Sequence, residues 1–110
     1  MAIAYKVLGQ SNPSAATATT LYTVPSATQT VVSTVTVANR AATAGTYRIA
    51  VRVAGAALAN SQYIAYDVSL PANASDTLTL GLTLGATDVI TVYASSADFT
   101  FSAFGSEITA

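Results

Sequence analysis

The sequence predicts an all-β protein: a single antiparallel β-sandwich of about eight short strands, jelly-roll or immunoglobulin-like. Apolar and polar residues alternate with a period of two along most of the 110 residues, as in TLTLGLTL at 77–84, and such alternation is typical of half-buried strands. Turn-forming residues recur at intervals of roughly ten residues, the spacing of a sandwich. No sustained 3.6-residue apolar period with helix caps accompanies them. The length fits one domain, 1–110.

A polar loop and a proline separate the first three expected strands. AYKVL (4–8) alternates and is predicted as the first strand. The polar run 10–20 contains Asn-Pro, which favours a turn. TLYTV (20–24) is a short strand that stops at Pro25. QTVVSTVTVA (29–38) is the third strand. One face of it is expected to carry Val31, Ser33, Val35 and Val37.

Two strands are expected in the middle of the chain. The first is GTYRIAVRVA (45–54), and the second is QYIAYDVSL (62–70), which ends at Pro71. Alternation in the first predicts that Tyr47, Ile49, Val51 and Val53 point inward and that Thr46, Arg48, Ala50 and Arg52 point outward. In the second, one face is expected to hold Ile64, Tyr66, Val68 and Leu70.

The last three strands are expected at 77–84, 88–94 and 97–108, with the tight turn GATD between the first two. In TLTLGLTL the four leucines need a core, and Thr77, Thr79 and Thr83 lie on the other face. Phe99 and Phe101 share a side of the final strand. Phe104 falls on the opposite side unless a bulge intervenes, and Gly105 is the place for one.

The composition points towards an assembly. Hydrophobic residues make up 52% and charged residues 8%, against about 25% charged in typical domains. Uncharged surface of this kind usually belongs to an interface. A net charge of −1 predicts no nucleic-acid partner and no binding to anionic membranes. Neither a signal peptide nor an apolar stretch of about 18 residues is found, so no membrane span is predicted.

The chain lacks histidine and cysteine, so no triad, thiol nucleophile or zinc-thiolate site is predicted. Asp76, Asp88 and Asp98 lie at expected turns, where aspartate commonly bonds the local backbone. No calcium-loop motif and no phosphate-binding glycine loop is present. We therefore expect a protein that is not an enzyme and has no cofactor and no metal.

The candidate functional residues are those of a protein–protein interface. Arg48 and Arg52 are expected on the outer face of one strand, and Asp67 on a neighbouring strand. Two interpretations stay open: a cross-strand ion pair, or a contact between subunits. With the threonine face of 77–84, the candidate interface comprises Arg48, Arg52, Asp67, Thr77, Thr79 and Thr83. The six tyrosines are spread over five expected strands, which favours core or sheet-edge positions over a sugar-stacking platform.

Three stretches carry a resemblance to a known class of proteins: YKVLGQSNPSAATATTLYTVPSATQTVVSTVTVANR (5–40), YRIAVRVAG (47–55) and LPANASDTLTLGLTLGATDVITVYAS (70–95). In these the sequence resembles small virion structural proteins of tailed bacteriophages, particularly those that infect cyanobacteria and other aquatic bacteria. The resemblance implies a compact β-sandwich, often trimeric, that decorates a capsid or builds part of a tail. It carries over no catalytic residues.

The predicted function is that of a capsid decoration (cement) protein, which stabilises the head by bridging capsomers. It would be made in the host cytoplasm, located in the virion, and partnered by copies of itself and by the major capsid protein. Segment 1–20 is a candidate arm that reaches a neighbour. One alternative is a tail, baseplate or fibre module partnered by tail proteins. Another is a carbohydrate-binding adhesin domain that uses tyrosines and loop aspartates.

Overall fold

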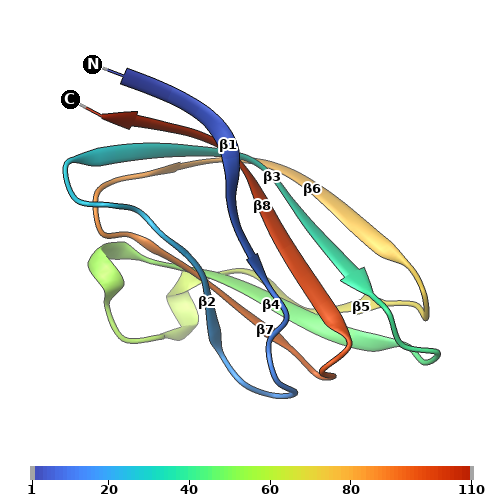
Figure 1. Cartoon of the computed structure of the whole chain (residues 1–110). Coiled ribbons are helices and arrows are strands. Elements are labelled where there is room, and N and C mark those ends of the chain that lie inside the picture. Colours follow the sequence, from blue (N-terminus) through green and yellow to red (C-terminus); the bar gives the residue numbers. More distant parts are fainter. Residues whose placement is uncertain (1, 110) are drawn as a thin grey trace.

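The computed structural model describes residues 2–109 and confirms the predicted β-sandwich. Eight antiparallel strands form two packed sheets of four, which we call sheet A (order β1-β8-β3-β6) and sheet B (order β2-β7-β4-β5) (Figure 1). The strands are β1 (Ala2–Ser11), β2 (Thr19–Thr23), β3 (Thr28–Asn39), β4 (Gly45–Arg52), β5 (Tyr63–Leu70), β6 (Ser75–Leu84), β7 (Val89–Ala94) and β8 (Phe99–Thr109).

The strand order decides between the two expected sandwich types. β1 pairs with β8, β2 with β7, β3 with β6 and β4 with β5, so the first half of the chain pairs with the second in nested order. Two further pairings, β3 with β8 and β4 with β7, complete the two sheets. This arrangement is the jelly roll, in which a long hairpin is rolled into two facing sheets.

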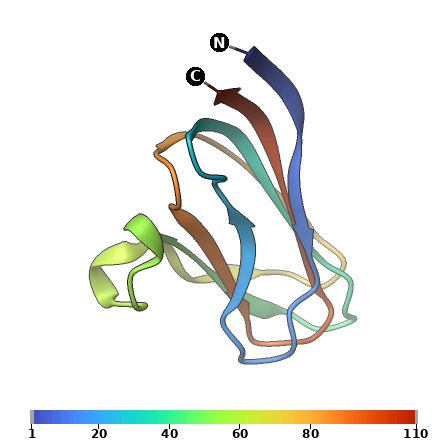
Figure 2. The same ribbon diagram turned by 60° about the vertical axis from the view of Figure 1, so that its left-hand side comes forward.

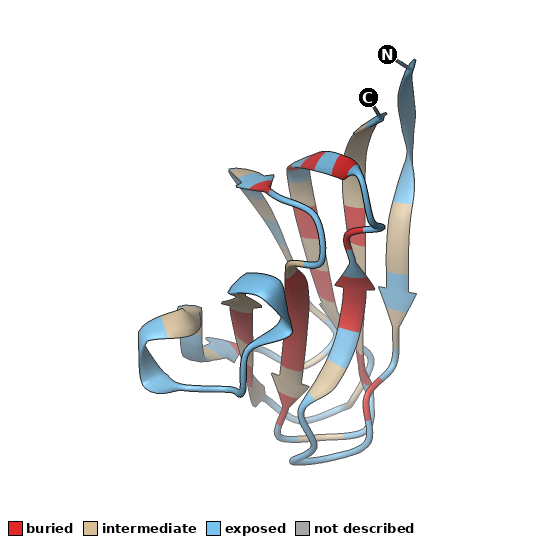
Figure 3. Cartoon of the chain, turned by 90° about the vertical axis from the view of Figure 1, so that its left-hand side faces the viewer, coloured by how far each residue is buried: buried red, intermediate tan, exposed pale blue. Residues whose placement is uncertain are grey.

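The core lies between the two sheets, and both contribute to it. Tyr47 packs against Phe99 and Phe101, with ring centroids 6.5 Å and 6.1 Å apart. Ile49 and Ile90 are fully buried beside them. Burial is concentrated in the middle of the molecule, and the projecting N-terminal half of β1 is exposed (Figure 3). Figure 2 shows the beginning of β1 and the end of β8 side by side, beyond the end of sheet B.

Helical structure in the described residues is limited to two 3₁₀ turns, η1 (Val53–Gly55) and η2 (Asn60–Gln62). Neither is long or apolar enough to cross a membrane. Both lie in the loop that connects β4 with β5. Val53, predicted to point inward, belongs to η1 and is 67% exposed. That prediction was wrong because the strand ends at Arg52.

A bulge in β3 corrects the predicted face of that strand. The register with β8 shifts between Val32 and Thr34, which leaves Ser33 as an extra residue. Buried positions are therefore even-numbered before the bulge and odd-numbered after it. Val32 is buried and Val31 is 36% exposed, so Val31 does not share the inner face of Val35 and Val37. Gly105 lies opposite this bulge; the extra residue belongs to β3 and not to the final strand, where a bulge at Gly105 was considered.

A second bulge corrects β5. Tyr47 pairs with Val68 and Ile49 with Ala65, so both Tyr66 and Asp67 lie opposite Arg48. Asp67 has a φ of 50°, a left-handed conformation that aspartate tolerates. Val68 and Leu70 face the core as predicted. The prediction for Tyr66 was wrong, because Tyr66 lies on the outer face and is 55% exposed. Ile64 shares the inner side with Val68 at the opening between the sheets, where it is 45% exposed.

In β6 the leucines stay on the inner side along the whole strand, although Gly81 has a φ of +61°. Leu84 is buried, and Leu78 and Leu82 pack against the core. Leu80 is 37% exposed beside an opening between the sheets. In β8, Phe99 and Phe101 face inward and Phe104 lies on the opposite face, as expected. Segment 2–11 is paired with β8 along its length, and its role as an arm stays a prediction.

Candidate interaction surfaces

Sheet A carries its charges on the side that faces sheet B. Its four strands hold three charged residues, Lys6, Asp76 and Glu107. Asp76 accepts a hydrogen bond of 2.8 Å from the hydroxyl of Tyr47 in the core. Glu107 accepts one of 3.0 Å from Lys6. Within the described residues, the outer face of sheet A therefore presents no charged side chain, the reverse of the usual distribution on a water-facing sheet.

The outer face of sheet A is apolar at the end where the chain termini lie. Register and alternation place six large apolar side chains there, from three neighbouring strands. Tyr5 is 84% exposed, and Ile3 and Val7 are each 49% exposed. We call this surface the apolar end; it consists of Ile3, Tyr5, Val7, Val31, Phe104 and Ile108.

Beyond the bulge the same face becomes rich in hydroxyl groups. Thr34 pairs with Thr79, and Thr36 pairs with Thr77 and with Ser102 on its other side. Thr83 pairs with Val31 and lies at the border with the apolar end. The structure thus places all three candidate threonines on the outer face of sheet A. Each hydroxyl group can donate and accept a hydrogen bond, and the threonine methyl groups can pack.

A polar cluster ties the two sheets together beneath the apolar end. The Tyr22 hydroxyl of β2 lies 2.8 Å from Thr30 Oγ1 and donates a 2.5 Å hydrogen bond to Glu107. Burial, and then this bond, raise the pKa of Tyr22 to about 12. The pKa of Glu107 is lowered, first by the bond from Tyr22 and then by the bond from Lys6. Sequence reasoning missed this cluster because its members lie far apart in the chain.

The candidate residues Arg48 and Asp67 meet on the outer face of sheet B. Arg48 donates from Nε to Asp67 Oδ1 at 2.6 Å and from Nη2 to Oδ2 at 3.3 Å. Its guanidinium carbon lies 4.2 Å and 4.4 Å from the ring centroids of Tyr66 and Tyr93. Hydrogen bonding to Asp67 raises the Arg48 pKa. The cross-strand pair is therefore present, and a contact between subunits stays a prediction.

Arg52 serves a different purpose on the same sheet. It donates to Thr91 Oγ1 at 3.0 Å and to the carbonyl oxygens of Gly55 and Ala56 at 3.2 Å and 3.0 Å. These bonds hold the β4–β5 loop against the strand, which makes Arg52 a structural residue of the fold. The six candidate interface residues thus divide between opposite sheets and cannot form one contiguous surface.

Three tyrosines gather on sheet B, which the spread of tyrosines along the sequence did not indicate. Only Tyr22 and Tyr47 are buried. Tyr63 and Tyr66 lie with their ring centroids 4.9 Å apart and their planes at 80°, and Tyr93 flanks Arg48 on the far side. Tyr63, Tyr66, Arg48 and Tyr93 therefore form a row across β5, β4 and β7.

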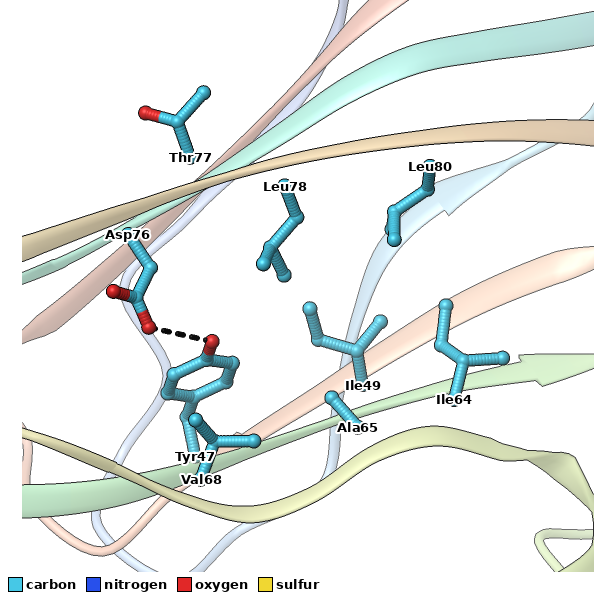
Figure 4. A pocket seen from close by; sticks show the side chains of 9 residues that line it. All are labelled: Tyr47, Ile49, Ile64, Ala65, Val68, Asp76, Thr77, Leu78 and Leu80. Carbon is cyan, nitrogen blue, oxygen red and sulfur yellow. Dashed lines mark hydrogen bonds between the residues drawn. The ribbon is translucent and has the colours of Figure 1, made fainter.

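An apolar groove opens between the free edges of β5 and β6 (Figure 4). It has a volume of about 390 Å³. Leu78 and Leu80 point towards Ile49 and Ile64 across it, and Thr77 points away. Its polar group is the Tyr47–Asp76 pair, where burial and then the bond to Asp76 raise the Tyr47 pKa.

Two of the three aspartates expected at turns, Asp88 and Asp76, have structural roles. Asp88 accepts from the backbone N–H groups of Gly85 and Ala54 at 2.9 Å and 2.8 Å, as expected of a turn aspartate. Asp76 instead bonds Tyr47 in the core, so its expected local role was wrong. Across residues 2–109, no group of three or more acidic, histidine or cysteine side chains is placed to hold a metal ion.

No protein-family model, curated protein sequence or solved structure matches this chain.

Proposed function

We propose that this protein is a non-enzymatic structural protein of a bacteriophage virion, a capsid decoration protein that bridges capsomers. The observation that carries the proposal is the uncharged outer face of sheet A. Its three charged residues are turned inward, and its outer side is apolar at one end and rich in hydroxyl groups at the other. Interface cores are depleted of charge in the same way.

The size of this face suits a protein partner. Four strands of about ten residues, about 4.8 Å apart and rising about 3.3 Å per residue, cover roughly 600 Å². That approaches the roughly 800 Å² that each partner buries in a standard interface. The proposed partners are further copies of this chain and the major capsid protein. The resemblance to phage virion proteins implies that the copies form a trimer. Jelly rolls also occur in viral capsid proteins, and this similarity of fold favours the same function by analogy.

The self-association is tested by light scattering over a dilution series with Tyr5→Lys and the control Val53→Lys. Tyr5 is 84% exposed in the apolar end, and Val53 is 67% exposed on the β4–β5 loop. The wild type and the control should form the same oligomer. Tyr5→Lys should dissociate at a concentration at least about tenfold higher, because a lysine would have to be desolvated in the interface.

A wild type that is monomeric at every concentration, or a Tyr5→Lys variant with wild-type mass, would contradict self-association through the apolar end. The location in the particle is tested by counting copies in purified virions that contain the chain. A copy number comparable with that of the capsid protein supports decoration. A few copies per particle, found with tail proteins, would instead place the protein in the tail.

A further inference from the structure

A hollow of about 420 Å³ lies on the outer side of sheet B, lined by Asn60, Tyr63 and Tyr66. Tyr63 and Tyr66 stand at 80° to each other and form a corner of two aromatic walls. Asn60 belongs to η2, directly before β5, and adds amide donor and acceptor groups beside the rings.

The corner is held in place before any ligand arrives. Arg48 stacks between Tyr66 and Tyr93, and Asp67 holds the guanidinium through two hydrogen bonds. The bulge in β5 lets Tyr66 and Asp67 both lie opposite Arg48. Because these rings are already ordered, their side chains lose little conformational entropy when a ligand stacks on them, and this favours binding.

The charges around the hollow select against ions. The Arg48 guanidinium is already paired with Asp67, whose side chain is 45% exposed and would repel an anion. A ligand cation would have to compete with Arg48 for that carboxylate. The groups left for recognition are aromatic ring faces, phenol hydroxyl groups and an amide. These suit a neutral molecule that has an apolar face and a rim of hydroxyl groups.

We propose that this hollow binds a neutral sugar ring, which stacks on Tyr63 or Tyr66 and hydrogen-bonds to Asn60 and the tyrosine hydroxyl groups. The site lies on sheet B, and the apolar end lies on sheet A. Sugar binding therefore goes beyond the proposed structural function and does not depend on it.

The test is saturation-transfer NMR with maltose, lactose, mannobiose and diacetylchitobiose, and with sialyllactose as a charged comparison. The full chain is compared with Tyr63→Ala and Tyr66→Ala. Val53→Ala is the control, because Val53 is 67% exposed on the β4–β5 loop and belongs neither to the hollow nor to the apolar end. At least one neutral sugar should bind the wild type and the control alike. Its Kd should rise about tenfold or more in both corner variants, since each removes a stacking surface.

Three results would overturn the proposal: no neutral sugar binding at millimolar concentration, binding that both corner variants retain, or binding of sialyllactose alone. Loss of folding is separated from loss of binding by the melting temperature. Tyr66 is 55% exposed, so Tyr66→Ala should keep a cooperative transition. Tyr63→Phe and Tyr66→Phe retain the rings and remove the hydroxyl groups, so each should weaken binding, but less than the matching alanine variant does.

Discussion

Tyr22→Phe removes one hydroxyl group and tests whether the polar cluster joins the two sheets. Tyr22 is 7% exposed, and its hydroxyl contacts Thr30 on β3 and Glu107 on β8. Phenylalanine fills the same space without a donor. The variant therefore leaves Glu107 with Lys6 as its remaining partner in this cluster, and it leaves the Thr30 hydroxyl group in a buried position.

The expected loss follows from the two hydrogen bonds. One to a charged group contributes about 1.5–3 kcal/mol, and a neutral one about 0.5–1.5 kcal/mol. The Glu107 side chain keeps 14% of its surface exposed, so water can replace part of the lost bond. We expect a loss of about 2 kcal/mol in the free energy of unfolding and a melting temperature lower by about 8 °C.

The loss should depend on pH. A carboxyl group whose pKa is lowered on folding stabilises the protein above its unfolded pKa, about 4.3 for glutamate. That stabilisation disappears as the pH falls through the folded pKa. Since Tyr22 is the largest cause of the lowered Glu107 pKa, the wild type and the variant should differ less at about pH 3 than at about pH 7.

Urea unfolding at both pH values measures this difference, with Tyr5→Phe as the control. The Tyr5 side chain is 84% exposed, and its hydroxyl group should contribute less than about 0.5 kcal/mol. The reasoning is refuted if Tyr22→Phe costs no more than the control. It is also refuted if the cost is the same at both pH values, because Glu107 would then not be the charged partner.

Three further outcomes are expected. Phe101→Ala should lower the free energy of unfolding in urea by about 3–5 kcal/mol, because the ring is 1% exposed. A loss below about 2 kcal/mol would mean that neighbouring side chains move in and fill the cavity. Gly105→Ala should lower stability by at least about 1 kcal/mol, because its Cβ would overlap the backbone of β3, and an unchanged midpoint would contradict that packing. The third outcome concerns alkaline titration. The pKa values of Tyr22 and Tyr47 are raised in the folded protein. Their contribution to stability is therefore complete below about pH 10, the pKa of an unfolded tyrosine, and is lost as the pH rises through their pKa values in the folded state. Tyrosinate absorbance should show them ionising only with cooperative unfolding, and an early, non-cooperative rise for all six tyrosines would count against their burial.

Alternation predicted the core wherever a strand stays in register with its neighbours. Tyr47 and Ile49 were assigned inward from their spacing, Phe99 and Phe101 were assigned to one shared side, and all four are buried. The prediction worked because the side-chain period of a strand is a local property, set by consecutive residues.

Alternation failed where a strand bulges. The extra residue Ser33 turns Val31 outward, and the bulge before Val68 turns Tyr66 outward. A bulge is an extra residue in one strand relative to its partner. It therefore depends on how the two strands pair and cannot be predicted from the sequence of either strand alone. These two bulges complete the apolar end and the row of tyrosines around Arg48, which is why sequence reasoning missed both surfaces.

By itself, the sequence determined the class of fold, the approximate position of all eight strands, and the scarcity of charge and of chemically reactive side chains. These are properties of composition and of neighbouring residues. Only the tertiary structure decided that the strands roll into a jelly roll, that Glu107 and Asp76 face inward to Tyr22 and Tyr47, and that Tyr63, Tyr66 and Arg48 share one face. Such groupings arise from strand pairing between residues up to about a hundred positions apart, and the pairing is settled by the free energy of the whole core and not by any single segment.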